Sequence, residues 1–257
     1  PVERAELAIL PDGSATLRVG TQSTGQGHET AWSQIVHEQL GIAWDRIDLL
    51  QSDSDALPAG GGTGGSRSLI MAGRTIMLAA DEIVQKAKAI AAEKLEAAEA
   101  DIEFSAVEGG GFRIAGTDRT MKLVDIAADQ GGLDGAGGVD DREATFPNGS
   151  HAAEVEIDPD TGHVRISRYT IVDDFGKLVN PLLVEGQVHG GVVQGAGQAL
   201  MEHAVWDPET GQPLTASFMD YAMPRAADTP MLPVIFNENA PCQTNPLGVK
   251  GCGEAGA

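Results

Sequence analysis

The sequence predicts an α+β fold of two layers, built from β-β-α units in two pseudo-repeated halves. Two segments with alternating apolar and polar residues, 5–20 and the segment from position 153 onward, each contain a Pro-Asp turn and are typical of β-hairpins. Each is followed by a connection and then a helix-like pattern. Residues 5–12 also resemble residues 153–160 at an offset of 148 positions, as a two-fold repeat would produce. Chance similarity between two common Pro-Asp turns is the alternative.

In the first half, residues 1–128, the apolar periodicity places the elements in order. After the hairpin we expect a helix over 28–40, capped by Gly41, and a strand over 46–51. A long amphipathic helix over 69–97 carries Ile76, Ile83 and Ile90 at a spacing of seven. Short strands at 102–104 and 112–114 and a short helix after Thr120 complete this half.

The second half is expected to span residues 151–257, after a Gly/Asp-rich loop or linker over 129–150. Asn180 is a good helix N-cap and Pro181 a good first helical residue, which predicts a helix after the second hairpin. This helix contains five glycines, each of which lowers helix propensity by roughly 1 kcal/mol relative to Ala. Such a pattern suggests that another backbone or a ligand comes very close. Strand-like stretches follow at 214–222 and 232–236.

Composition excludes several classes of partner. The chain has 257 residues, 17 of them Lys or Arg and 38 Asp or Glu, for a net charge of −21. That charge argues against nucleic acid, because phosphate binding needs clustered basic residues. No apolar run approaches the ~18–20 residues needed to cross a bilayer, so no membrane segment is expected. Two cysteines and no visible targeting segment favour free thiols and a cytoplasmic location.

Glycine is the composition's unusual feature, with 33 residues, and it gathers in four stretches with embedded polar residues. The stretches cover 25–30, 60–68, 186–194 and 245–257. Backbone N–H groups at glycine-rich turns and helix N-termini suit phosphate, and Ser66, Arg67 and Ser68 add donors. The pattern lacks a P-loop ending, and tight turns without a ligand are the alternative interpretation.

The last stretch contains one carboxylate, Glu254, surrounded by small residues. A carboxylate on such a loop can approach a ligand, and partial burial there would suit a general base. A solvated loop glutamate is the alternative. Lys250 is expected to be a solvent-facing or structural charge. The six histidines do not show zinc-ligand spacing.

Five sequence motifs occur in the same order as in a known protein family. They are GQGHET, GTGGSRS, VNPLLVEGQVHGGVVQGAGQAL, SFMDYAMPRA and TNPLGVKGCGEAG. The chain resembles, over essentially its whole length, the C-terminal half of the molybdenum-cofactor-binding large subunit of the xanthine dehydrogenase, aldehyde oxidase and aerobic carbon monoxide dehydrogenase family. The motif wording is similar to that of the carbon-monoxide-dehydrogenase-like group.

The resemblance implies site residues. Glu254 matches the glutamate next to molybdenum that acts as base. The residues that match contacts to molybdopterin cytosine dinucleotide are Gly25, Gln26, Gly27, Gly65, Ser66, Arg67, Ser68, Gln194 and Gly253. The implied activity is hydroxylation of a small substrate with water-derived oxygen, in a molybdenum-dependent oxidoreductase.

The resemblance also implies partners: the N-terminal half of the same subunit, an iron–sulfur subunit and an FAD subunit. The chain lacks an initiator Met and ends in a glycine-rich loop, so we expect a fragment that alone holds no molybdenum cofactor and is inactive. Two other functions stay open from the residues: a non-catalytic glycine-rich module that binds an anion or nucleotide, and a module that only docks partner subunits.

Overall fold

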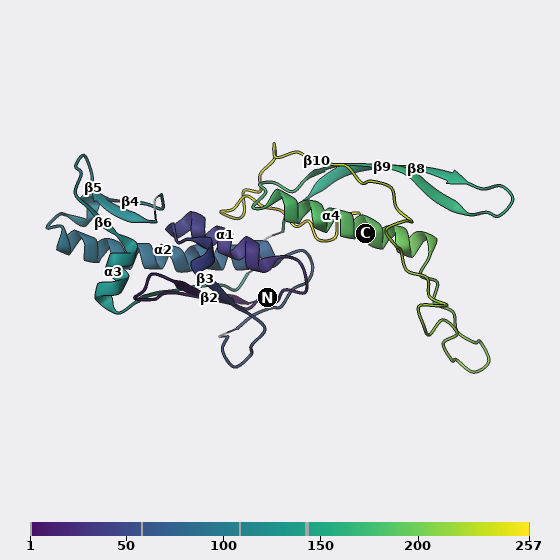
Figure 1. Ribbon diagram of the computed structural model, residues 1–257, viewed down its shortest axis with the longest axis horizontal. Helices are drawn as coiled ribbons and strands as arrows, with labels where there is room; N and C mark the ends of the chain where they lie inside the picture. Colours follow the sequence, from purple (N-terminus) through teal and green to yellow (C-terminus); the bar gives the residue numbers. More distant parts are fainter. Residues whose placement is uncertain (1, 58, 108, 142–143, 257) are drawn as a thin grey trace. The chain divides into compact units, whose positions relative to one another are not determined.

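The computed structural model describes residues 2–57, 59–107, 109–141 and 144–256 and divides the chain into two compact units (Figure 1). Unit 1 comprises Pro1–Ala144 and Gln243–Leu247, and unit 2 comprises Thr145–Cys242 and Gly248–Ala257. Ala257, the last residue of the fourth glycine-rich stretch, lies outside the described residues. Among those residues, no helix is both long and apolar enough to cross a lipid bilayer.

Unit 1 is built on a four-stranded sheet in the order β3-β2-β1-β7. Strands β1 (Glu3–Ile9) and β2 (Ala15–Val19) form the expected hairpin, and β3 (Ile47–Leu50) runs parallel to β2. The alternation of the hairpin places Ala5, Leu7 and Ile9 in the core. Helix α1 (His28–Leu40) packs against β3 and against α2 (Ser68–Lys94), which lies across β1 and β7. These helices and strands match the expected ones within a few residues.

The fourth strand corrects the expected linker over 129–150, because β7 (Leu133–Val139) lies within it and pairs with β1 along its whole length. We expected a loop here because the segment is rich in glycine, which is uncommon inside strands. The physical reason for the glycines is contact with a helix: a Cβ on Gly135 would overlap the Ala79 carbonyl oxygen, and one on Gly137 the Thr75 carbonyl oxygen. The strand is glycine-rich because α2 lies directly on its backbone.

A small outer sheet completes unit 1, with strands in the order β4-β5-β6. Its elements and the short helices around it are η1 (Trp44–Arg46), η2 (Glu99–Asp101), β4 (Ile102–Ser105), β5 (Gly111–Ile114), β6 (Thr120–Lys122) and α3 (Leu123–Gln130). Helix α3 is the short helix expected after Thr120.

Unit 2 consists of the long hairpin β8 (Asn148–Ile157) and β9 (Val164–Asp174), helix α4 (Pro181–Leu200) and strand β10 (Val234–Phe236) (Figure 1). Asn180 caps α4 as expected: its side-chain oxygen accepts a hydrogen bond of 3.1 Å from the Leu183 N–H. The apolar stripe of α4 packs on the end of β9 and on Leu232. The buried core residues are Ile171, Phe175, Val184, Val188, Val192 and Leu232.

The two units repeat one topology, and the α+β fold is confirmed. In each, an antiparallel hairpin is followed by a helix and then by a strand parallel to the second hairpin strand: β1-β2-α1-β3 in unit 1 and β8-β9-α4-β10 in unit 2. The similar stretches 5–12 and 153–160 lie at the same place in both hairpins. The expected strand over 214–222 is wrong, because this segment forms turns, with Asp220 and Tyr221 N–H groups bonded to the Ser217 carbonyl.

Substitution of Gly137 tests the direct contact between α2 and β7. Gly137→Ala should lower the free energy of unfolding by about 1–3 kcal/mol, because a new methyl group must displace the α2 backbone. Gly138 is a matched control on the opposite face of the same strand, where the nearest atoms to a Cβ belong to the partly exposed Arg4 side chain rather than to backbone. Gly138→Ala should change stability by no more than about 0.5 kcal/mol. Urea unfolding measures both, and equal costs would contradict the proposed packing.

Candidate functional site

The two glycine-rich loops of unit 1 lie side by side. Gly20, directly after β2, contacts Gly60 so closely that a Cβ on either residue would overlap the other's backbone. Beyond this contact, the Thr63 hydroxyl donates to the Gln22 carbonyl at 2.5 Å, and the Ser68 hydroxyl donates to Thr63 Oγ1 at 3.2 Å. The loop that leads into α1 and the loop that leads into α2 are therefore joined.

The loop before α2 turns sharply at two consecutive left-handed residues, Gly65 at φ +59° and Ser66 at φ +51°. A left-handed serine costs on the order of 1–3 kcal/mol and is found mainly where function or packing requires it. Arg67 follows as the N-cap of α2, and its guanidinium donates to the Gly61 carbonyl. Arg67 is thus occupied in holding its own loop together.

Gln26 folds back over its own loop. Its Oε1 accepts a 2.5 Å hydrogen bond from the Thr24 N–H, and its Nε2 donates to Thr24 Oγ1 at 3.0 Å. Gly25 and Gly27 on either side are left-handed, at φ +111° and +78°, and Gly27 is the N-cap of α1. Within the described residues, neither α1 nor α2 has a side-chain hydrogen bond capping its N-terminus.

Behind these loops lies a group of buried polar atoms that the sequence did not single out. Thr21 Oγ1, His28 Nδ1 and Trp32 Nε1 are buried and have no hydrogen-bond partner in the described part of the chain. The His28 and Trp32 rings lie 4.7 Å apart, and burial lowers the pKa of His28, which favours its neutral form. Only the one-turn spacing of His28 and Trp32 on one helix could have suggested this group.

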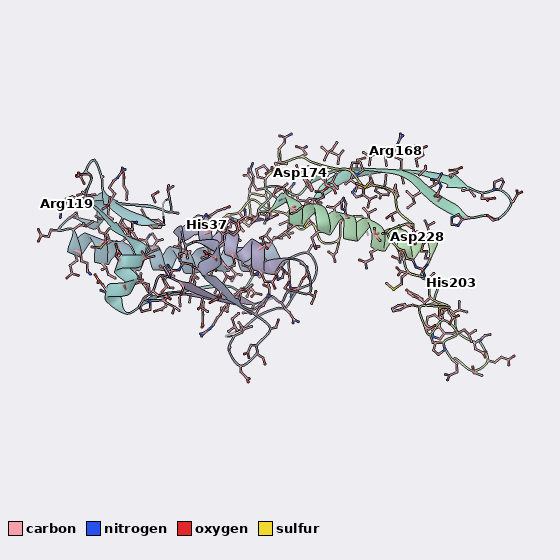
Figure 2. The ribbon with its side chains drawn as sticks, viewed as in Figure 1. His37, Arg119, Arg168, Asp174, His203 and Asp228 are labelled. Carbon is pink, nitrogen blue, oxygen red and sulfur yellow. The ribbon has the colours of Figure 1, made fainter. Side chains whose placement is uncertain are left out.

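In unit 2, the C-terminal segment is fixed by a buried ion pair. Lys250 Nζ lies 2.8 Å from Asp174 Oδ1, and both side chains are less than a tenth exposed. Asp174 ends β9, where Figure 2 labels it. Burial acts to raise the pKa of Asp174, but the hydrogen bonds from Lys250 and the Gly176 N–H and the charge of Lys250 hold it below its usual value. The Lys250 N–H also donates to the Phe175 carbonyl at 2.7 Å. Lys250 is a structural charge.

The turn over residues 251–256 follows this pair and packs on α4. A Cβ on Gly191 would overlap the Ala255 carbonyl oxygen, so this helical glycine leaves room for the turn. Cys252 packs against the unit 2 core, and burial raises the pKa of its thiol to about 11, which keeps it protonated and unreactive at neutral pH. Neither cysteine forms a disulfide.

Glu254 and Gly253 are exposed on this turn. The partial burial expected for Glu254 is therefore wrong for unit 2 taken by itself. Gln194 is also exposed, on α4, one turn after Gly190 and two turns after Gly186. A Cβ on Gly186 or Gly190 would meet nothing within 4 Å, so these two glycines and Gln194 form an open stripe on the helix.

The predicted site residues thus form two groups. The first group lies on the two adjoining loops of unit 1. The second group lies in unit 2, on α4 and on the turn packed against it. The first group is Gly25, Gln26, Gly27, Gly65, Ser66, Arg67 and Ser68, and the second is Gln194, Gly253 and Glu254.

Substitution of Lys250 tests the ion pair that precedes the turn. Lys250→Met should lower the free energy of unfolding by about 3–5 kcal/mol, because Asp174 would keep a buried charge without its partner. Adding Asp174→Asn should recover most of this loss, because the amide oxygen still accepts the Gly176 hydrogen bond. Lys177→Met is the control: Lys177 pairs with Glu238 at 3.7 Å on the surface, and its loss should cost no more than about 1 kcal/mol. Urea unfolding measures all three, and an equal cost for both lysines would contradict the assignment.

Comparisons with known proteins show which family this chain belongs to. Residues 1–230 match the family model described as "Molybdopterin cofactor-binding domain". The chain is 40% identical to the 6-hydroxypseudooxynicotine dehydrogenase complex subunit gamma of Paenarthrobacter nicotinovorans, over 99% of this chain and 33% of that protein. It is 38% identical to the carbon monoxide dehydrogenase large chain of Afipia carboxidovorans, over 98% of this chain and 32% of that protein.

Solved structures agree. The chain superposes on the Cu,Mo-CO dehydrogenase in its carbon monoxide reduced state with a TM-score of 0.92 and 36% identity, covering 99% of this chain and 33% of that one. Quinoline 2-oxidoreductase from Pseudomonas putida 86 gives a TM-score of 0.89 and 32% identity, over 99% of this chain and 33% of that one. The chain spans about a third of the length of the curated relatives it matches. The family resemblance seen in the sequence is confirmed, and this chain belongs to the molybdopterin cofactor-binding domain family.

Proposed function

We propose that this chain belongs to the large subunit of a molybdenum-dependent oxidoreductase and contributes to binding molybdopterin in its cytosine dinucleotide form. The observation that carries the proposal is the pair of joined glycine-rich loops in unit 1, each of which leads into the N-terminus of a helix. Backbone N–H groups at such termini favour anions, which the phosphate groups of the cofactor provide.

The residues of unit 1 fit a cofactor that carries phosphate groups. Gly25, Gly62 and Gly64 leave the space above their backbone open, since a Cβ on any of them would meet nothing within 4 Å. The Gln26 amide has a second N–H besides the one donated to Thr24, and the Ser66 and Ser68 hydroxyls on the neighbouring loop could turn from their present partners to a bound ligand. A chain with a net charge of −21 needs such concentrated donors to bind a phosphate-bearing ligand.

Unit 2 would contribute a second set of residues. The open stripe of Gly186, Gly190 and Gln194 presents helix backbone and one amide side chain, and the neighbouring turn presents Gly253 and Glu254. We assign Gln194 and Gly253 to cofactor contacts and Glu254 to catalysis. A carboxylate would repel an anion bound beside it, which disfavours a simple anion-binding module, and the similarity to molybdenum-dependent oxidoreductases favours the enzyme over a docking module.

In the proposed mechanism, the bound cofactor would supply the two-electron oxidation and the transfer of water-derived oxygen to a small substrate. The chain's own contribution is orientation and proton transfer. The Glu254 carboxylate would accept the proton released in the reaction, as a general base held on a small-residue turn. The glycine-rich loops of unit 1 would hold the phosphate groups and so fix the cofactor.

The proposed site needs more than this chain. Because about two thirds of each matched relative lies outside it, we propose that the N-terminal half of the same subunit completes the cofactor site. Iron–sulfur and FAD subunits would carry the electrons away. This stretch by itself is then expected to hold no stoichiometric molybdenum and to be inactive.

Substitution of Gly64 tests the cofactor loops. Gly64→Ala in the full-length protein should leave stability within about 0.5 kcal/mol of wild type, because the new methyl group enters open space. It should lower molybdenum and cytosine nucleotide content severalfold, because the cofactor would occupy that space. Elemental analysis and chromatography of the released nucleotide measure both. Gly138→Ala is the control and should load normally. Full loading of Gly64→Ala would place the cofactor elsewhere.

Substitution of Glu254 tests the assigned base. Glu254→Gln keeps the shape of the side chain but cannot accept the proton, so turnover should fall by at least about 10²-fold while molybdenum content stays at the wild-type level. The assay measures reduction of an artificial dye by carbon monoxide, nicotine, quinoline or xanthine, whichever the wild type oxidises fastest. Near-normal turnover would remove Glu254 from the catalytic role.

A further inference from the structure

Two consecutive aspartates end β9, and they bind on opposite sides of the strand. Successive side chains of a strand point to opposite faces, so Asp174 reaches Lys250 while Asp173 reaches His151 on β8. Lys250 immediately precedes the turn over residues 251–256. The other aspartate, Asp173, is only 5% exposed, and its imidazole partner is not used by the mechanism above.

The contact between Asp173 and His151 is specifically built. His151 Nε2 lies 3.1 Å from Oδ1 and 3.2 Å from Oδ2 of Asp173. The carboxylate crosses over Gly149, where any Cβ would overlap Asp173 Oδ1. Gly149 is the β8 residue paired with Asp173, so its missing side chain gives the carboxylate a path to His151.

The second ring nitrogen of His151 is also held. Nδ1 lies 3.2 Å from the Tyr169 hydroxyl, and the two rings meet edge to face at 5.8 Å. We assign the Nε2–H as donor to the carboxylate and Nδ1 as acceptor from the phenol, which is the arrangement that satisfies all three groups. With both nitrogens bonded, the imidazole has one fixed orientation.

The fixed ring contacts the far end of the turn. A Cβ built on Gly256 would lie 3.1 Å from His151 Cε1 and 2.6 Å from Val192 Cγ2, so one side of this otherwise exposed glycine lies against the imidazole and α4. Gly256 has φ +80°, a left-handed conformation that glycine adopts without strain. The turn is therefore held at its start by Lys250, at Ala255 by α4, and at Gly256 by His151.

We propose that His151, oriented by Asp173 and Tyr169, is a positioning residue that fixes the end of the turn and thereby the direction of the Glu254 carboxylate. The catalytic part of this inference rests on the proposed function of Glu254. The structural part, that His151 holds the turn, stands on the contacts alone. Apart from Glu254, the turn consists of glycine, alanine and cysteine, which offer few side-chain contacts to fix its conformation, so the imidazole supplies a further contact.

Hydrogen exchange in the full-length protein tests the structural part without any activity measurement. In His151→Ala, peptides covering residues 251–256 should exchange about tenfold faster than in wild type, while peptides from the first turns of α4 stay unchanged. His151→Gln, which keeps a donor for Asp173, should restore most of the protection. His163→Ala is the matched control, because His163 is exposed on the turn of the same hairpin.

Two outcomes would overturn the structural part: unchanged exchange of the turn in His151→Ala, or equally faster exchange throughout unit 2. If His151→Ala does not fold, Tyr169→Phe decides, because it removes only the hydroxyl that holds Nδ1. Faster exchange confined to residues 251–256 then supports the proposal, and unchanged exchange overturns it.

Kinetics test the catalytic part, with the same dye assay as for Glu254. His151→Ala should lower kcat by about 10- to 100-fold with KM changed by no more than about twofold, since a misplaced base affects the reaction step rather than binding. In a Glu254→Gln background the same change should cause no further loss. Near-normal turnover of Glu254→Gln alone would refute the catalytic role proposed for Glu254. A full additional loss in the double variant would refute the positioning role instead.

Discussion

Direct contact between backbone segments, where only glycine leaves room, is the constraint on which both units depend. In unit 1 it seats α2 on β7 at Gly135 and Gly137 and joins the two candidate loops at Gly20 and Gly60. In unit 2 it seats the C-terminal turn on α4 at Gly191. Side chains at these positions would overlap the neighbouring backbone and force the segments apart. The high glycine content is therefore first a packing requirement and only then a binding feature.

The glycines fall into two physical classes that the sequence does not distinguish. One class is filled by the chain itself, as at Gly137 and Gly191. The other faces open space, as at Gly64, Gly186 and Gly190. Only the second class can receive a ligand, because the first already has a backbone partner. Both classes of glycine occur in similar glycine-rich motifs, so the three-dimensional structure is needed to tell them apart.

Local signals in the sequence were enough to predict most elements. The Pro-Asp hairpins, the cap at Asn180 and the seven-residue spacing of Ile76, Ile83 and Ile90 depend on short-range geometry, and each led to an element found in the structure. The strand β7 was missed because its glycines are required by contact with Ala79 and Thr75 of α2, which lie more than fifty residues earlier in the chain. The expected strand over 214–222 failed because alternating apolar residues need a neighbouring strand, and that segment has none in the described structure.

For the candidate site, the sequence motifs identified the loops but not what holds them. Arg67 was expected as a donor to phosphate, yet its guanidinium donates to the Gly61 carbonyl, whereas Lys250 is the structural charge that was one of the two roles expected for it. His151 carried no signal, because its partners Asp173 and Tyr169 become neighbours only through the register of the hairpin. A sequence motif identifies the residues that contact a ligand. The residues that orient them lie on other helices and strands and leave no local pattern in the sequence.

The exposure of Glu254 indicates how the work of catalysis would be divided. Unit 2 contacts the turn at three points but leaves Glu254 exposed, so in the proposed role it would supply direction without an enclosed environment. A general base gains efficiency when water is excluded around it, and for Glu254 in the proposed role the remaining walls would have to come from the cofactor or from the rest of the protein. If Asp173, His151 and Lys250 set the orientation in advance, as we propose, enclosing groups need not also order the turn when they arrive. The free-energy cost of ordering is met during folding, which leaves binding energy available for the reaction.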